Sequence, residues 1–261
     1  MACSRSGDPT EDLAEEHVPA QLRIFSPTVT KIIAHRGYWN KNKAAENSLA
    51  ALDNAIEAGL YGSEFDVRMT SDGVIVINHD SEISGMTIER TPYARLQNVK
   101  LLNGEKLPTL RDYLSYAKGK NIKMICELKA HEMPSNNIRL TDSVVAIVNE
   151  LEVQEQIEYI SFVTQICQRI KELSPDAHIL LLSTAKFEPA ILQKMGLSGV
   201  SYYFEEMKNH SAWITEAHDS TLQIGVWVVN NLQWMHTFVN QDVDYITTDK
   251  PGTLKEMLGI Q

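Results

Sequence analysis

The sequence predicts an α/β fold, a single (β/α)8 TIM-type barrel with a short hairpin and insertion after its second strand. From Lys31 onward, short apolar runs alternate with amphipathic segments, which is the pattern of repeated strand–helix units. Eight such runs occur, and eight units are the number that closes a barrel of parallel strands. The chain has 261 residues, a length that one such domain commonly has.

The expected strands are spaced as strand–helix units require, with one exception. They begin near Ile32, Ser63, Ile122, Ile157, His178, Gly199, Leu222 and Val243. Successive starts are 31, 59, 35, 21, 21, 23 and 21 residues apart. The long step contains a further strand-like run at residues 74–78, after the turn signal Ser71-Asp72-Gly73, and a polar stretch at residues 81–106. We therefore expect a hairpin and a small insertion on this loop.

The first 25 residues differ from the barrel domain expected at residues 26–261. Residues 4–20 are polar, acidic and without periodicity, as in a tail that buries little. Two interpretations of Cys3 stay open: a thiol without a role, or the lipid anchor of a bacterial lipoprotein whose signal has been removed. The sequence as given has no apolar leader, so it predicts no signal peptide. The lipoprotein interpretation implies a periplasmic or membrane-anchored protein, and the other a cytoplasmic one.

The composition excludes several classes of protein. The 24 basic and 34 acidic residues give a net charge of −10 without a basic run, so no nucleic-acid partner is expected. No apolar run approaches the length of about 18 residues that predicts a membrane-spanning helix. The three cysteines follow neither a zinc-site nor a disulfide spacing. An acidic protein that handles an anion needs a metal ion or a few well-placed cations.

Three carboxylates lie on two of the expected strands. Strand alternation places Glu64 and Asp66 on one face, opposite Phe65, and places Glu127 on the polar face of the next strand of the barrel. Two carboxylates on one inward face repel each other, and a divalent cation between them would relieve that repulsion. Three oxygen ligands suit Mg²⁺ or Ca²⁺ better than zinc. The alternative is a set of salt-bridged polar residues inside the barrel.

Two histidines fall at strand ends near these carboxylates. His35 ends the first strand and His79 follows the hairpin strand, so the pair could share acid and base work. Arg36 is suited to a phosphate group, and Gly37 permits a sharp departure from the strand. Trp227, late in the seventh strand, is either a pocket wall or a core residue. The other histidines, His17, His131, His178, His210, His218 and His236, are expected to be structural, as are the thiols of Cys126 and Cys167.

Nine short motifs then follow one another along the chain. They are His35-Arg36-Gly37, Glu46-Asn47-Ser48, Glu64-Phe65-Asp66-Val67, Thr70-Ser71-Asp72-Gly73, His79-Asp80, Leu107-Pro108-Thr109-Leu110, Glu127-Leu128-Lys129, Val226-Trp227-Val228-Val229-Asn230 and Ile246-Thr247-Thr248-Asp249-Lys250-Pro251. Each motif is weak alone. Together, and in this order, they resemble the glycerophosphodiester phosphodiesterase family from Lys31 to about Gly252.

The resemblance implies a metal-dependent barrel that cleaves small-molecule glycerophosphodiesters to glycerol 3-phosphate and an alcohol. It implies that one divalent cation, Mg²⁺ or Ca²⁺, is held by Glu64, Asp66 and Glu127. It implies an acid/base pair made of His35 and His79. The residues that it implies for substrate binding are Arg36, Lys129, Trp227 and Glu46, the last also as a support for Arg36, His35 or the metal.

Departures from the family pattern are small, and two alternatives remain open. Ala45 and Ser48 stand where the family often has proline and threonine, which removes no chemical group, and Asn47 or Ser48 can still cap the next helix. Residues 81–90 follow the pattern loosely, which leaves the preferred alcohol open. The alternatives are a related barrel phospholipase acting on lipid phosphodiesters and a catalytically silent phosphodiester-binding protein.

Overall fold

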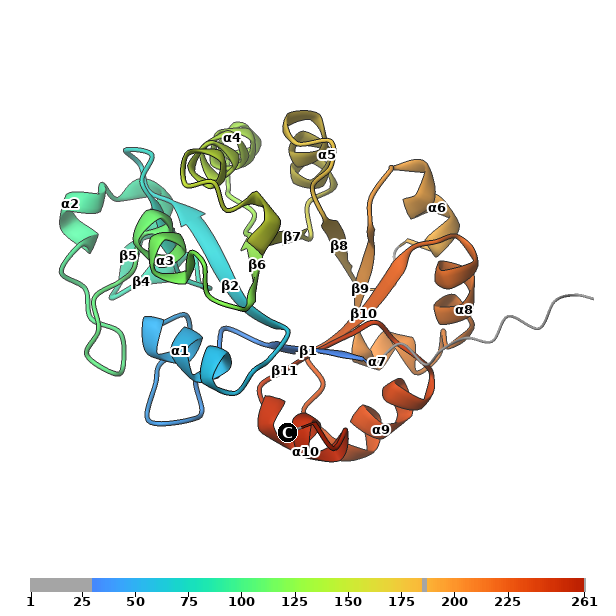
Figure 1. Cartoon of the computed structure of the whole chain (residues 1–261). Helices are drawn as coiled ribbons and strands as arrows, with labels where there is room; N and C mark the ends of the chain where they lie inside the picture. The colour runs from blue at the N-terminus through green and yellow to red at the C-terminus, as the bar shows by residue number, and fades with distance from the viewer. Residues whose placement is uncertain (1–29, 185–186, 261) are drawn as a thin grey trace, which may run out of the picture.

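The computed structural model describes residues 30–184 and 187–260, and these form a closed barrel of eight parallel strands (Figure 1). The barrel strands are β1 (Lys31–Ala34), β2 (Gly62–Met69), β6 (Lys123–Leu128), β7 (Ile157–Ser161), β8 (Ile179–Ser183), β9 (Gly199–Tyr203), β10 (Gln223–Trp227) and β11 (Tyr245–Thr248). The ring closes where β1 pairs with both β2 and β11. All eight strands begin within two residues of their predicted starts, so the predicted barrel is confirmed.

Helices follow the strands and cover the outside of the barrel. They are α1 (Leu49–Glu57), α3 (Leu110–Ala117), α4 (Pro134–Glu150), α5 (Thr164–Leu173), α6 (Pro189–Lys194), α7 (Phe204–Met207), α8 (Ala212–Asp219), α9 (Leu232–Asn240) and α10 (Pro251–Met257). The described residues also contain two short 3-10 helices, Ile88–Arg90 and Gln154–Gln156. Among the described residues, no helix is long and apolar enough to cross a membrane.

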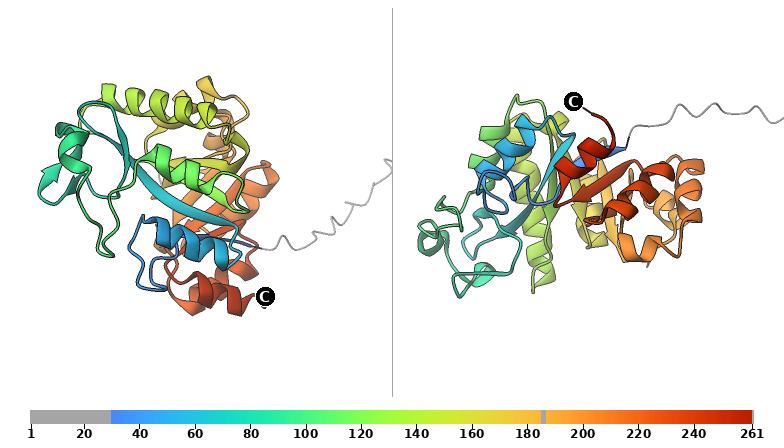
Figure 2. Two further views of the ribbon diagram at one scale, coloured as in Figure 1. Left: turned by 60° about the vertical axis from the view of Figure 1, so that its left-hand side comes forward. Right: turned by 90° about the horizontal axis from the view of Figure 1, so that it is seen from below.

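The predicted hairpin and insertion follow β2. Strand β3 (Ile75–Ile77) pairs antiparallel with β2, after a turn in which Gly73 has a φ of +87°. The insertion then adds a two-stranded ribbon of β4 (Glu82–Ile83) and β5 (Met86–Thr87), and the short helix α2 (Tyr93–Leu96). It lies to one side of the ring of helices in each view of Figure 2. A small core of Val76, Ile88, Leu96 and Leu107 holds it against the barrel.

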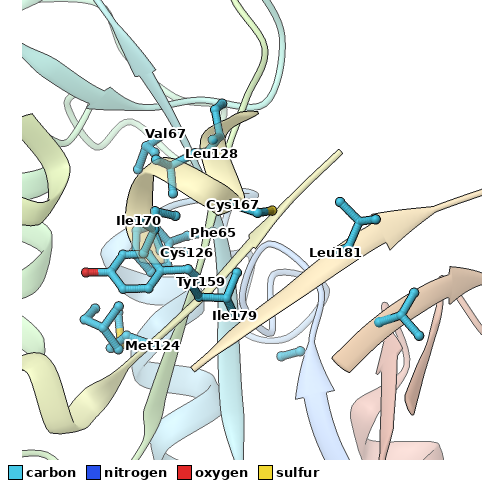
Figure 3. Packing of buried hydrophobic residues seen from close by; sticks show 14 of the residues in the cluster. Phe65, Val67, Met124, Cys126, Leu128, Tyr159, Cys167, Ile170, Ile179 and Leu181 are labelled. Carbon is cyan, nitrogen blue, oxygen red and sulfur yellow. The ribbon is translucent and has the colours of Figure 1, made fainter. Parts of the chain in front are cut away.

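Side-chain alternation divides the barrel residues between two environments. Phe65, Val67, Cys126 and Leu128 point outward and join the large core between strands and helices (Figure 3). Their neighbours in sequence point inward, and the interior is closed by a separate cluster: Ile33, Ile125, Ile160, Leu180, Leu182 and Tyr245. The outward face therefore stabilises the domain, and the inward face is left for polar side chains at the ends of the strands.

The predicted tail at residues 1–25, including Cys3 and His17, lies outside the described residues. The interpretations of Cys3 and the location that depends on them therefore stay predictions. Cys126 and Cys167 are buried free thiols in the large core, as predicted.

Candidate active site

The carboxyl ends of the barrel strands surround a cavity of about 150 Å³. Its lining includes His35, Arg36, Glu64, His79, Glu127, Lys129 and Trp227. These residues come from segments as far apart as β1 and β10, which the closure of the ring brings together. Asp66 joins them through contacts with Lys129 and Arg36. The ninth predicted site residue, Glu46, lies outside this cavity and lines a neighbouring groove.

Glu64, Asp66 and Glu127 form a compact and buried carboxylate triad. One oxygen from each lies within 4.8 Å of those of the other two. Asp66 and Glu127 are aligned partners in the parallel pairing of β2 with β6, which explains their closeness. Glu64 is two residues earlier on the same face of β2. Its Oε1 atom is buried and has no hydrogen-bond partner among the described residues.

Burial and mutual repulsion disfavour full ionisation of this triad. Burial, together with the charges of Asp66 and Glu127, raises the pKa of Glu64 well above its usual value. Burial and the charge of Asp66 raise the pKa of Glu127 to about 7. The site thus concentrates more negative charge than the protein alone neutralises. A cation with oxygen ligands would relieve the repulsion and satisfy Glu64 Oε1, so the three carboxylates fit a divalent metal ion.

Asp66 is the carboxylate of the triad that stays ionised. Burial opposes its ionisation, but Lys129, the hydrogen bond from Asn47, and the charges of His79 and Arg36 outweigh burial and lower its pKa. Asn47 holds it at two points, donating from Nδ2 to Asp66 Oδ2 at 2.9 Å and accepting from the Asp66 backbone N–H at 3.1 Å. Lys129 Nζ lies 3.3 Å from Asp66 Oδ1 and 2.7 Å from Glu127 Oε1.

Arg36 is fixed by its backbone as well as by its side chain. Its φ of +54° and the φ of +78° at Gly37 turn the chain sharply after β1, as predicted for Gly37. The Arg36 N–H then donates to Glu64 Oε2 at 2.7 Å. The guanidinium donates to Glu46 Oε2 at 2.7 Å, so the expected support of Arg36 by Glu46 is present. Arg36 Nε is buried without a hydrogen-bond partner among the described residues and lies 3.8 Å from Asp66 Oδ2.

Each of the two histidines has a carboxylate at its Nδ1 atom. His35 Nδ1 lies 2.8 Å from Asp249 Oδ1, and His79 Nδ1 lies 2.7 Å from Asp80 Oδ1. Because a carboxylate only accepts, both Nδ1 atoms carry the proton, and the Nε2 atoms are the ones available to a ligand. Burial, with the charges of Lys129 and Arg36, lowers the pKa of His79 despite the opposing charge of Asp66 and the hydrogen bond to Asp80.

Asp249, Asn230 and Asn47 stand within the predicted motifs, but no role in the site was predicted for them. Asp249 accepts hydrogen bonds from Trp39 Nε1 at 3.3 Å and from Asn230 Nδ2 at 2.6 Å. One signal could have identified Asp249, which directly follows the last strand, at the end of the barrel where catalytic groups gather. Asn47 carries no such signal, because it acts through a contact with Asp66 that spans 19 residues.

Trp227 lies at the cavity, as one of the two alternatives for this residue predicts. Its indole N–H donates to Ser201 O at 3.0 Å, and Phe162 packs edge-on against its ring at 5.3 Å. His131, predicted to be structural, is a buried acceptor for the Met69 N–H. His178 and His218 bond to Gln223 and Asp244, away from the cavity.

Comparison with known proteins identifies the family. The model of the glycerophosphoryl diester phosphodiesterase family matches residues 35–253. The chain belongs to this family. The match runs from the end of β1 into α10 and includes His35 and His79, so the predicted family and enzyme class are confirmed.

Relatives cover the same region. A glycerophosphodiester phosphodiesterase of Caldanaerobacter subterraneus is 26% identical over 245 residues, 86% of this chain and 96% of the relative. The crystal structure of a glycerophosphodiester phosphodiesterase from Parabacteroides distasonis is 37% identical with a TM-score of 0.87, covering 89% of this chain and 98% of that one. A phosphodiesterase from Oleispira antarctica, solved with the product sn-glycerol-3-phosphate, shares the fold at 21% identity and a TM-score of 0.80, covering 88% and 97%.

Proposed function

We propose that this family member hydrolyses glycerophosphodiesters to glycerol 3-phosphate and an alcohol, with one divalent cation and two histidines. One observation carries the proposal: a single cavity gathers two imidazoles, each with a carboxylate at its Nδ1 atom, the Arg36 guanidinium, and carboxylates from β2 and β6. The product complex of the Oleispira antarctica phosphodiesterase supports the assignment of the product.

Glu64, Asp66 and Glu127 would hold the cation, Mg²⁺ or Ca²⁺. The bound ion would supply a Lewis acid for the phosphoryl oxygens. The protein prepares this site, since Asn47 holds Asp66 at two points and Arg36 holds Glu64 through its backbone N–H. Lys129, which pairs with two of the three carboxylates, keeps part of their charge balanced and stands close enough to meet an entering phosphate.

Arg36 would stabilise the charge of the transition state, and the two histidines would transfer the protons. Charge on the phosphoryl oxygens grows in the transition state, and the Arg36 guanidinium stabilises it from a fixed position. The Nε2 atom of one histidine takes the proton of the attacking oxygen, and the other histidine gives a proton to the leaving alkoxide. The attacking oxygen belongs to water, or to the neighbouring glycerol hydroxyl in a route through a cyclic phosphate. The direct route moves these two protons once. The cyclic route moves them once when the cyclic phosphate forms, and a second pair of protons moves when water opens it.

The test is release of glycerol 3-phosphate from glycerophosphocholine and glycerophosphoethanolamine, run in parallel with EDTA, Mg²⁺ and Ca²⁺. We expect release with at least one metal and none with EDTA. Release that is unaffected by EDTA would overturn the metal site. Cleavage of intact phospholipid vesicles in preference to these substrates would favour the phospholipase alternative. Binding of glycerol 3-phosphate in calorimetry without turnover of any substrate would favour the silent binder.

A further inference from the structure

One arginine beside the site, Arg68, has no role in the proposed function. It follows Asp66 by two residues on β2, so strand alternation places both side chains on the inward face of the strand. Its guanidinium donates two hydrogen bonds, and both go to backbone carbonyl oxygens rather than to carboxylates. An arginine in such a place either balances charge or holds the chain, and the positions of its two acceptors favour the second role.

The two acceptors belong to different segments, each of which carries a residue of the site. Arg68 Nε donates to His79 O at 2.9 Å, and Nη1 donates to Ala130 O at 3.2 Å. His79 follows the hairpin strand β3 and belongs to the proposed acid/base pair. Ala130 directly follows Lys129, in the loop at residues 129–133 that leads from β6 to α4. One planar guanidinium therefore links the end of the hairpin to the end of β6.

We propose that Arg68 is a positioning residue that holds the main chain of His79 and so sets the place of its imidazole in the cavity. This inference rests on the proposed function, and it adds which residue locates the second histidine. Proton transfer needs the imidazole within hydrogen-bond reach of the reacting oxygen. A misplacement of about 1 Å can slow a reaction by about 10²-fold. Loss of the Arg68 contact should therefore lower turnover.

His79 depends on this contact because its other contacts are few. Asp80, the partner of its Nδ1 atom, is 80% exposed, so water competes for that contact. One residue earlier, the Asn78 N–H donates to Asp66 O at 3.0 Å, which ends the backbone pairing along β2. Among the described residues, the hydrogen bond from Arg68 is the one that the His79 backbone itself makes. A half-buried arginine thus fixes the base of the imidazole, while only an exposed carboxylate holds its ring.

The other acceptor of Arg68 has a fixed position. Neighbours of Arg68 in the sequence bond to the neighbours of Ala130. These bonds run from the Lys129 N–H to Val67 O at 3.2 Å and from the Met69 N–H to His131 Nε2 at 3.0 Å. The Ala130 carbonyl is therefore held relative to β2 on both of its sides. A guanidinium bound to this carbonyl keeps its orientation, and its Nε atom then fixes His79 O.

The two hydrogen bonds require an arginine. A guanidinium is planar and presents its N–H donors in a rigid arrangement, whereas a lysine has one ammonium at the end of a flexible stem. Lysine carries a methylene group where Arg68 has Nε. Arg68→Lys would thus keep a positive charge beside the carboxylate triad and lose the donor to His79 O. This substitution separates a role in position from a role in charge balance.

The test is a double-mutant cycle, measured on glycerophosphocholine with the activating metal. Arg68→Lys and Arg68→Met should each lower kcat by about 10-fold or more, with KM changed by less than about 2-fold. In the His79→Ala background, the same substitutions should lower kcat by less than about 2-fold further, because the group that Arg68 positions is gone. The rise of the unfolding midpoint on saturation with metal should be the same in Arg68→Lys as in the wild type.

The matched control is Arg169→Lys. Arg169 also uses Nε and Nη1 to bind two partners, Asp142 at 2.8 Å and Glu172 at 2.9 Å, and it is not among the residues that line the cavity. Its replacement should leave kcat as it is.

Four results would overturn the inference. They are a wild-type kcat in Arg68→Lys, a rise of KM in place of a fall of kcat, an equal loss with and without His79, and a weaker effect of metal on the unfolding midpoint of Arg68→Lys. The third would show a structural role that does not act through His79, and the fourth a role in the carboxylate triad. No turnover of any substrate by the wild type would instead overturn the proposed function, and this inference with it.

Discussion

At the scale of single residues, the two histidines differ in how firmly their partners are held. Asp249 is 23% exposed and accepts hydrogen bonds from His35, Trp39 and Asn230. Asp80, the partner of His79, is 80% exposed. A carboxylate with several donors keeps one geometry, so the orientation of His35 is set by the fold, whereas that of His79 depends on a solvated contact.

The histidines themselves give the first prediction. His35→Ala and His79→Ala should each lower kcat by about 10²-fold or more, because each variant lacks one of the two proton transfers. Steady-state kinetics on glycerophosphocholine measures the loss. A variant that keeps near-wild-type turnover would show that its histidine is not part of the acid/base pair.

Asp249 is predicted to act as a positioning residue. Asp249→Asn should lower kcat by at least about 10-fold with little change in KM, because an amide no longer enforces the proton on His35 Nδ1. It should also change the pH profile of kcat. The matched control is Asp244→Asn, which alters the remote His218 pair (3.1 Å between Nε2 and Oδ2) and should change stability without changing the pH profile. Equal effects of the two substitutions on kcat would contradict a positioning role.

At the scale of elements, helix α1 places the loop that carries Glu46 and Asn47. Ser48, fully buried, accepts a hydrogen bond from the Ala51 N–H at 3.1 Å and caps the helix, as predicted for Asn47 or Ser48. Glu105 binds the two preceding N–H groups. The start of α1 is therefore held both by its own cap and by the insertion, and the contact between Asn47 and Asp66 depends on that start.

Removal of the cap should be measurable. Ser48→Ala should lower the free energy of unfolding by about 1 kcal/mol, since it removes the side-chain acceptor of a helix N-cap. Ser211, at the start of α8, makes no side-chain cap bond, so Ser211→Ala is the matched control and should be close to neutral. Denaturant unfolding of both variants gives the comparison, and equal losses would show that the Ser48 cap contributes nothing specific.

At the scale of the whole molecule, a protein with a net charge of −10 keeps three of its carboxylates close together inside its barrel. Burial raises the pKa of Glu127 to about 7, so in the folded state it holds a proton that the unfolded chain, with a usual value of 4.5, releases. Glu64 shifts in the same direction. The pKa of Asp66 is lowered from 3.8, so its contribution changes only at lower pH.

Stability and metal binding should consequently be linked through pH. Without metal, the free energy of unfolding should fall as the pH rises from about 4.5 to about 7, because the folded state binds more protons than the unfolded state in that window. Saturating Mg²⁺ or Ca²⁺ should stabilise the fold and flatten or reverse this slope, since the metal binds the ionised carboxylates. Unfolding midpoints at pH 5 and pH 7.5, with EDTA or metal, measure both effects. Glu127→Gln should have a smaller slope in EDTA, and a slope equal to that of the wild type would contradict this origin.

Much of the fold follows from local patterns in the sequence. Short apolar runs predict the eight strands, and the turn signal Ser71-Asp72-Gly73 predicts the hairpin. Alternation along β2 places Phe65 and Val67 in the outer core and their neighbours Glu64 and Asp66 inside, as the structure shows. These features depend on residues close together in the sequence, and strand geometry or turn chemistry relates such residues directly.

The sequence by itself thus determined the barrel, the strands that carry the carboxylates, and the histidines at the ends of β1 and the hairpin. Only the tertiary structure decided which side chains bind and orient these carboxylates and histidines. Asp249 reaches His35 across 214 residues because β11 closes the ring against β1. Glu105 of the insertion likewise binds the Leu49 and Ala50 N–H groups across 56 and 55 residues. The physical reason is that hydrogen bonds and subsites depend on distances in the closed barrel, and no periodicity along the chain encodes those distances.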